Sequence, residues 1–203
     1  MAIIQINPSN PEEHKIKFVS EMILNDKIII CPTDTLYAIV CKLSNKNGIE
    51  KICKIVGKKP EKANLSIICS SLKHISDYSL QFNKNIYKMM NKNLPGPYTF
   101  ILKANNKIPK LFLNKRKTIG IRVPNQLITL KIVDYIDEPL VCASVNLSEN
   151  SEFTNQIDEI DLTYNKQVDL IIDSGNLNVL GSAVIDCSGE EPELIREGLM
   201  PLN

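Results

Sequence analysis

The feature that most constrains the fold is a set of short apolar runs spaced along the chain. KIIIC at residues 27–31 and LYAIVC at residues 36–41 consist mainly of apolar residues, without the alternation of a half-exposed strand. Runs of this length are typical of strands that are covered on both faces, which requires helices on both sides of the sheet. The two runs therefore favour an α/β architecture.

Amphipathic segments alternate with such strands over the first two thirds of the chain, and strands cluster at the end. The first predicted helix has Asn10 as its N-cap and Pro11 at its first position. Helices are predicted at residues 9–24, 45–56, 84–93 and 126–136. Strands are predicted at residues 2–6, 65–72, 98–104, 139–145, 167–173, 181–188 and 193–198, with another that ends before Pro124. This order predicts one α/β domain over residues 1–203, with a mixed β-sheet and helices packed on it.

Composition limits the partners and the compartment. The formal net charge is +1, so no global field favours nucleic acid or an anionic membrane, although a local basic patch is compatible with it. The six cysteines lack the spacing of a zinc or redox motif, and we expect buried free thiols in a reducing compartment. The N-terminus has no signal layout and no apolar run reaches membrane length, so we expect a cytoplasmic protein with no membrane partner.

Arginine is scarce in this chain. Of 24 basic residues, only Arg116, Arg122 and Arg196 are arginines. Where lysine is the default cation, an arginine is more often retained for planar, bidentate pairing with a carboxylate or a phosphate. The alternative for any one of them is chance. The three arginines are therefore candidates for ion pairs or for a phosphate site.

Small polar residues follow several predicted strands. The segment 32–35 (PTDT) follows one strand, Ser144 and Asn146 follow another, and the segment 173–175 (DSG) follows a third. Ligands of open α/β sheets usually bind beyond the carboxyl ends of the strands, where hydroxyls and amides orient a small polar ligand. Local turn structure is the alternative, because threonine and aspartate side chains also bond to nearby backbone.

Two basic loops, at residues 58–59 and 115–117, resemble phosphate-facing groups, although such loops are more often merely solvated. The sequence has no Walker-type loop, no glycine-rich dinucleotide turn and no evident Ser-His-Asp set or covalent nucleophile. A polar cleft beside cationic loops suits a reaction that works by positioning and charge neutralisation, such as attack on a nucleotide phosphate.

Seven motifs, in the same order, resemble the YrdC-type domain found in L-threonylcarbamoyladenylate synthases. PTDTLYAI at residues 32–39 is similar to the PTDTVYGL of that family, and it is followed by PGPYTFIL, TIGIRVP, SVNLS, VDLIIDSG, GSAVID and LIREG. The motifs span about residues 15 to 200. The resemblance implies a YrdC/RibB-like fold, in which a twisted mixed β-sheet with surrounding helices forms a concave, positively charged cleft.

The same resemblance implies a nucleotidyltransferase that makes threonylcarbamoyl-AMP and pyrophosphate from L-threonine, bicarbonate and ATP, with Mg²⁺ assisting. The product serves the threonylcarbamoyl (t6A) modification of tRNA. This implies contact with tRNA or double-stranded RNA, and with t6A-transferase partner proteins. No protein nucleophile and no metal-ligating side chain are expected.

The resemblance also implies roles for individual residues. Threonine would be held by Thr33, Thr35 and Tyr37. The nucleotide would be held by Lys59, Ser144, Asn146, Ser182 and Arg196, and Arg122 would shape the cleft.

One segment departs from the synthase pattern. Gly57 stands at the first Lys of the family's Lys-x-Arg pair, Lys59 stands at its Arg, and Ala63-Asn64 stand at the Lys-Pro that follows. Lys54 and Lys58 are candidates to replace the lost cation. These departures resemble the YciO-like paralogue branch. The alternatives are therefore a YciO-like paralogue with weak or altered nucleotide activity, a structured-RNA or tRNA-binding protein, or a carbamoyl-handling domain with another acceptor.

Overall fold

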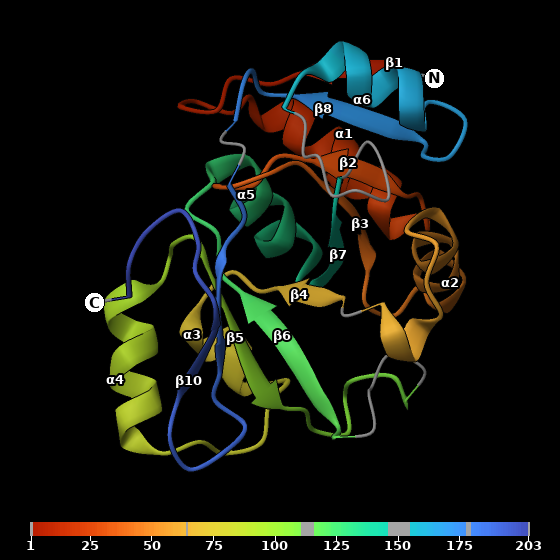
Figure 1. The fold of residues 1–203 in the computed structure, drawn as a ribbon. Helices are drawn as coiled ribbons and strands as arrows, with labels where there is room; N and C mark the ends of the chain where they lie inside the picture. Colours follow the sequence, from red (N-terminus) through yellow and green to blue (C-terminus); the bar gives the residue numbers. More distant parts are fainter. Residues whose placement is uncertain (1, 64, 111–115, 146–154, 178–179, 203) are drawn as a thin grey trace.

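The computed structural model describes residues 2–63, 65–110, 116–145, 155–177 and 180–202. The strands in these ranges are β1 (Ala2–Gln5), β2 (Ile29–Cys31), β3 (Ala38–Lys42), β4 (Ser66–Ile68), β5 (Tyr98–Lys103), β6 (Thr118–Arg122), β7 (Leu140–Ser144), β8 (Leu170–Asp173), β9 (Ala183–Asp186) and β10 (Glu193–Arg196). They form a single sheet in the order β1-β8-β2-β3-β7-β4-β6-β5-β9-β10 (Figure 1). Parallel pairs, such as β4 with β6, occur beside antiparallel pairs, such as β3 with β7. The predicted α/β class with a mixed sheet is confirmed.

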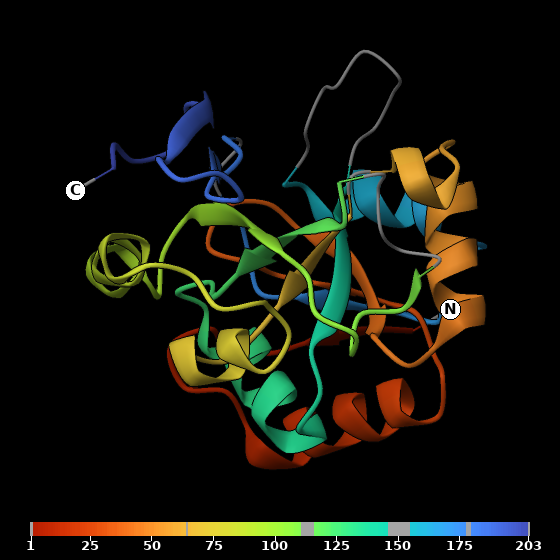
Figure 2. The ribbon, with the colours of Figure 1, turned by 90° about the horizontal axis from the view of Figure 1, so that it is seen from below.

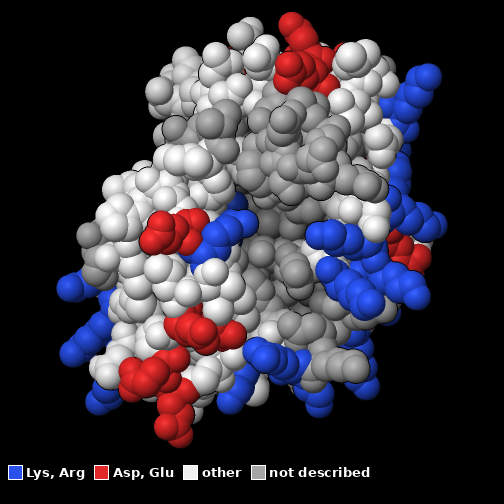
Figure 3. Space-filling model, in the orientation of Figure 1, with Lys and Arg blue, Asp and Glu red and all other residues white. Residues whose placement is uncertain are grey.

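Helices cover the sheet unequally. They are α1 (Glu13–Leu24), α2 (Lys46–Ile55), α3 (Leu72–Ser76), α4 (Lys84–Asn93), α5 (Leu127–Ile136) and α6 (Ile157–Tyr164), with a 3₁₀ turn η1 (Pro60–Lys62). Helices α1 and α5 pack side by side on the face that lies away from β10 (Figure 2). The opposite side of the molecule, on which β10 lies, has a hollow at its centre (Figure 3).

The central strands bury both faces, as their apolar runs predict. In β2, Ile29 and Cys31 belong to the hydrophobic cluster under α1 and α5, whereas Ile30 belongs to the cluster on the opposite face. In β3 the same alternation places Val40 in the first cluster and Cys41 in the second. A run of consecutive apolar residues therefore fills two cores at once. The polar turn that follows the carboxyl end of β2 is therefore held on a rigid support.

Three predictions about the elements were wrong in detail. Helix α1 begins at Glu13 rather than at Pro11, because the side chain of Asn7 accepts from the backbone N–H of Ser9 (2.9 Å) and of Asn10 (3.3 Å) and turns the chain early. The strand predicted over residues 65–72 is only three residues long, and α3 follows it. Helix α6 was not predicted at all.

All six cysteines are buried free thiols, as predicted. Burial raises the pKa of Cys31 to about 12, so this thiol stays protonated at neutral pH.

Candidate functional site

The turn between β2 and β3 is closed by the hydroxyl of Thr33. Its Oγ1 donates to the backbone oxygen of Leu36 (2.6 Å) and accepts from the backbone N–H groups of Thr35 and Leu36 (3.2 Å each). Thr33 is buried, and its hydroxyl hydrogen is used inside the turn. The side-chain to backbone bonding that the sequence left open as an alternative is thus present at this residue.

Thr35 and Tyr37 are also fully buried and bonded within the protein. The Thr35 hydroxyl accepts from Nη2 of Arg122 at 3.0 Å. The Tyr37 hydroxyl accepts from the backbone N–H of Ser174 (3.1 Å) and donates to the backbone oxygen of Gly175 (2.7 Å). Burial raises the pKa of Tyr37, so its phenol stays protonated and keeps this donor role. Contact of these hydroxyls with threonine stays a prediction.

Arg122 forms a buried ion pair with Asp34. Its Nη2 lies 2.8 Å from Oδ1 of Asp34, and each side chain is 8% exposed. The other carboxylate oxygen of Asp34 accepts from the backbone N–H of Asn125 at 2.9 Å. The pair therefore ties the β2–β3 turn to the end of β6 and the start of α5. Carboxylate pairing was one of the two roles expected of a rare arginine, and Arg122 confirms it, through a single nitrogen.

Arg196 lies against Ser182, the residue that precedes β9. Its Nε and Nη2 both donate to the backbone oxygen of Ser182, at 3.2 and 2.8 Å. The buried Ser182 hydroxyl lies 2.8 Å from that of Thr99. Burial lowers the pKa of Arg196, and the positive charge of Arg122 lowers it further. We call Arg122, Arg196 and the hydroxyls of Thr35 and Ser182 the arginine wall.

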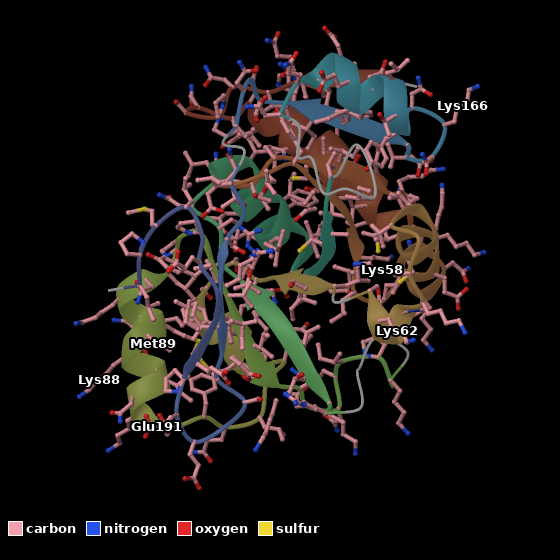
Figure 4. The ribbon with its side chains drawn as sticks, viewed as in Figure 1. Lys58, Lys62, Lys88, Met89, Lys166 and Glu191 are labelled. Carbon is pink, nitrogen blue, oxygen red and sulfur yellow. The ribbon has the colours of Figure 1, made fainter. Side chains whose placement is uncertain are left out.

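Exposed lysines lie across the hollow from β10. Lys58, Lys59 and Lys62 have no ion-pair partner among the described residues. Side chains labelled in Figure 4 show Lys58 and Lys62 beside α2 and η1, and Figure 3 shows cationic atoms on both sides of the hollow. Ser144 is exposed at the end of β7, and Asn146 lies outside the described residues.

The segment that departs from the synthase pattern has its own structural cause. Gly57 has a φ of 68°, and its N–H donates to Lys54 O while the N–H of Lys58 donates to Cys53 O. This is the glycine-ended C-terminus of α2, where a left-handed residue is needed. Ala63 ends η1, and Asn64 lies outside the described residues. The glycine at position 57 thus serves helix termination.

A cavity of about 430 Å³ lies beside the β2–β3 turn. Thr33, Asp34 and Gln126 contribute its polar side, and the C-terminal residues Leu199 and Met200 contribute to its apolar side. Its lining includes no lysine or arginine, so this cavity is a poorer place for a phosphate than the hollow.

Sequence reasoning missed Asp34 and Thr99, and it did not single out Lys62. Asp34 received no role, although it lies inside the PTDT motif and a rare arginine needs a carboxylate. Thr99 was also missed, because a threonine in a strand carries no signal for a hydroxyl pair with a residue 83 positions away. Arg116 is exposed, and it approaches Asp186 only to 4.0 Å.

Two further features bear on ligands and location. Within the described ranges, no group of three His, Cys, Asp or Glu side chains is arranged to hold a metal ion. In the same ranges, no helix has the length and apolar character needed to cross a bilayer.

The chain is similar to known proteins over most of its length. A family model described as Sua5_yciO_yrdC, telomere recombination, matches residues 21–198. The uncharacterized protein YciO of Escherichia coli K12 is 39% identical over 197 residues, which are 96% of this chain and 94% of the relative. A putative threonylcarbamoyl-AMP synthase of Methanocaldococcus jannaschii is 37% identical over 205 residues, or 98% of this chain and 94% of the relative.

Solved structures agree with the fold. The crystal structure of E. coli YciO superposes with a TM-score of 0.93 at 35% identity, covering 98% of this chain and 97% of that one. Sua5 of Pyrococcus abyssi, crystallised with L-threonine, gives a TM-score of 0.91 at 24% identity, and this chain spans 59% of its length. The second likeness shows the shared fold alone.

Proposed function

The chain belongs to the Sua5/YciO/YrdC family, and we propose that it is a nucleotidyltransferase that makes threonylcarbamoyl-AMP and pyrophosphate from L-threonine, bicarbonate and ATP. Relatives named as threonylcarbamoyl-AMP synthases support the reaction class. The product would serve t6A modification of tRNA together with partner transferases.

The observation that carries this proposal is the pair of cationic surfaces that face each other across one hollow. Arg196 lies on the β10 side, with Arg122 close enough to lower its pKa, and the exposed Lys58 and Lys62 lie on the α2 side. Such opposed cations suit a polyphosphate that reaches from one side to the other. The wall's hydroxyls, from Thr35 and Ser182, add hydrogen-bonding groups for smaller polar substrates.

The proposed reaction needs no protein nucleophile. The amine of threonine adds to bicarbonate-derived CO₂ and loses a proton, which gives a carbamate. A carbamate oxygen then forms a bond to the α-phosphorus of ATP, and the bond from that phosphorus to the bridging oxygen breaks, so that pyrophosphate leaves. The protein's part is to hold both substrates in line, neutralise the phosphates and keep water from the mixed anhydride.

Mg²⁺ would enter with ATP in this proposal. Magnesium commonly keeps several waters and binds through substrate phosphates with one or two carboxylates, so a dedicated three-ligand protein site is not required. The described residues are compatible with that arrangement. Magnesium bound to the phosphates would offset part of their negative charge.

The test is release of pyrophosphate from ATP by purified protein, with threonine, with serine and with no amino acid. We expect bicarbonate-dependent release that threonine stimulates more than serine does. Release that is the same with and without threonine, at high protein concentration, would contradict the synthase proposal and favour altered nucleotide chemistry. Mass spectrometry of the nucleotide product distinguishes threonylcarbamoyl-AMP from AMP.

Binding of structured RNA is the second candidate, because the lysines beside α2 are exposed and have no acidic partner among the described residues. It predicts an affinity for double-stranded RNA that falls steeply as salt increases. An affinity that does not change with salt would contradict this electrostatic mode.

A further inference from the structure

We propose that Asp34 is an internal countercharge that weakens the hold of the arginine wall on anions, so that pyrophosphate leaves after each reaction. By pairing with Arg122 it keeps the summed charge of Asp34, Arg122 and Arg196 at +1 instead of +2. The inference rests on the proposed function, since it takes the anion at this wall to be a phosphate group of ATP or of pyrophosphate.

Asp34 is fixed in place from two sides. One carboxylate oxygen accepts from Arg122 Nη2 at 2.8 Å, and the other accepts from the backbone N–H of Asn125 at 2.9 Å. With only 8% of its side chain exposed, the carboxylate has little water to screen its charge. It therefore acts on Arg122 as a permanent partner.

Arg122 needs a partner because it is buried. Its Nη2 is shared between Asp34 and the hydroxyl of Thr35, and its Nε is buried without a partner among the described residues. Because little water reaches this guanidinium, its charge has to be balanced by a partner inside the protein. If Asp34 lost its charge, an anion entering the wall would become the nearest compensation for Arg122.

Arg196 shares this electrostatic environment. Arg196 donates two hydrogen bonds to the backbone oxygen of Ser182, and the positive charge of Arg122 lowers its pKa. Two like charges at one wall would bind a multiply charged product tightly. Tight binding that is equal in the ground state and in the transition state adds nothing to turnover, and product release limits many enzymes. A countercharge beside the inner arginine reduces that hold while leaving Arg196 available.

The test is the affinity for inorganic pyrophosphate, measured by calorimetry on the whole chain without any turnover. Asp34→Asn keeps the size of the side chain and one acceptor oxygen, and it removes the charge. We expect it to bind pyrophosphate at least about fivefold more tightly at low salt, with a smaller gain at high salt. In the threonine-dependent assay, both kcat and the KM for ATP should fall. Asp34→Glu should restore the weaker binding.

Asp169 offers a matched control. Its carboxylate also accepts from a backbone N–H, that of Ile28 (2.9 Å), and also pairs with a cation, Lys27, at 3.5 Å. Asp169→Asn should therefore show any general cost of losing a strand-end carboxylate, with no change in pyrophosphate affinity.

A double variant keeps the proposal testable if Asp34→Asn does not fold. Asp34→Asn with Arg122→Gln removes both buried charges, a change that proteins often tolerate. Because the summed charge stays at +1, its pyrophosphate affinity should stay within about twofold of the natural protein.

Three outcomes overturn the inference. The first is unchanged or weaker pyrophosphate binding by folded Asp34→Asn, and the second is no binding by either the natural protein or Asp34→Asn. The third is a loss of pyrophosphate affinity of about tenfold or more in the double variant, which would place Arg122 directly on the anion. Tighter binding by Asp34→Asn in a protein that shows no threonine-dependent turnover would leave the countercharge standing and remove the synthase proposal. The two failures are thus distinguishable.

Discussion

A buried hydroxyl can meet a ligand only by using hydrogen-bonding capacity that its internal partners leave over. Thr33 Oγ1 donates its hydrogen to Leu36 O and accepts from the backbone N–H groups of Thr35 and Leu36, so both its donor and its two acceptor positions are used. The Thr35 hydroxyl accepts from Arg122, which leaves it one acceptor position. Of the two threonines, Thr35 is the better placed to accept from a substrate amine.

Thr35→Ala tests this role. Loss of the hydroxyl should raise the KM for threonine by about tenfold, because one hydrogen bond to a charged group is lost, and should change ATP affinity less. Thr35→Ser retains the hydroxyl and should behave nearly as the natural protein does. Thr163 on α6 donates to a backbone oxygen at an exposed position, so Thr163→Ala is the matched control. An equal loss of threonine and ATP affinity in Thr35→Ala would indicate a general structural role.

His74 should make stability depend on pH. Burial lowers the pKa of His74, against the opposing effect of nearby Asp77, Asp137 and Asp134. Its Nδ1 accepts from the backbone N–H of Ser70 at 3.3 Å, a bond that only the neutral ring can accept. As pH falls through about 6.5, the unfolded chain gains a proton that the folded protein resists, so stability decreases.

The measurement is the melting temperature between about pH 7.5 and pH 5.5. His74→Gln retains an acceptor for Ser70 and should reduce the fall in melting temperature over this range. His14 is exposed on α1, so His14→Gln is the control for replacing a histidine outside the Ser70 contact. A slope that His74→Gln does not change would assign the acid sensitivity to other groups.

At the scale of elements, helices and strands were predicted best where the periodic or continuous run of apolar residues was longest. The strands β2 and β3 were predicted from continuous runs that fill two cores, and α4 was predicted with its bounds, Lys84–Asn93. The short elements β4 and α3 share one stretch, residues 65–72, in which no period is long enough to separate them. The start of α1 was missed because a side chain three residues before Asn10 decides it.

Gly57 ends α2 at the position where the resemblance to the synthases predicts a lysine. Gly57 has a left-handed backbone, where any residue with a Cβ is strained. Gly57→Lys should therefore lower the free energy of unfolding by about 1–2 kcal/mol, measured by urea denaturation, and should not tighten pyrophosphate binding. Gly57→Asn should cost less, because asparagine tolerates this conformation. Tighter pyrophosphate binding by Gly57→Lys would show instead that a cation here reaches the phosphates.

At the scale of the whole molecule, the site is assembled from segments far apart in the sequence. Arg122 ends β6, Arg196 ends β10, and the lysines belong to the loop after α2. The sequence singled out Arg122, Arg196, Lys58 and Lys59 one by one, through rare arginines, a basic loop and ordered motifs, but it did not single out Lys62. It could not predict that Asp34 would engage Arg122 or that Arg196 would rest on Ser182, because these contacts depend on how the twisted sheet brings strand ends together.

A ligand that reaches across the hollow should interact with both the lysines beside α2 and the arginine wall. The lysines are exposed, so salt should screen their electrostatic attraction for the ligand. The double change Lys58→Ala and Lys62→Ala should weaken ATP binding by about fivefold or more at low salt and should flatten its salt dependence. It should also reduce the rise in melting temperature that ATP causes, since that rise follows the affinity.

Lys88 on α4 and Lys166 lie away from the hollow (Figure 4), so Lys88→Ala with Lys166→Ala removes the same net charge as a control. Equal losses in both double variants would mean that ATP responds only to the total charge of the protein. A loss confined to the first would place the phosphates between the lysines and the arginine wall, so that the cation missing from position 57 is supplied by its neighbours in the chain.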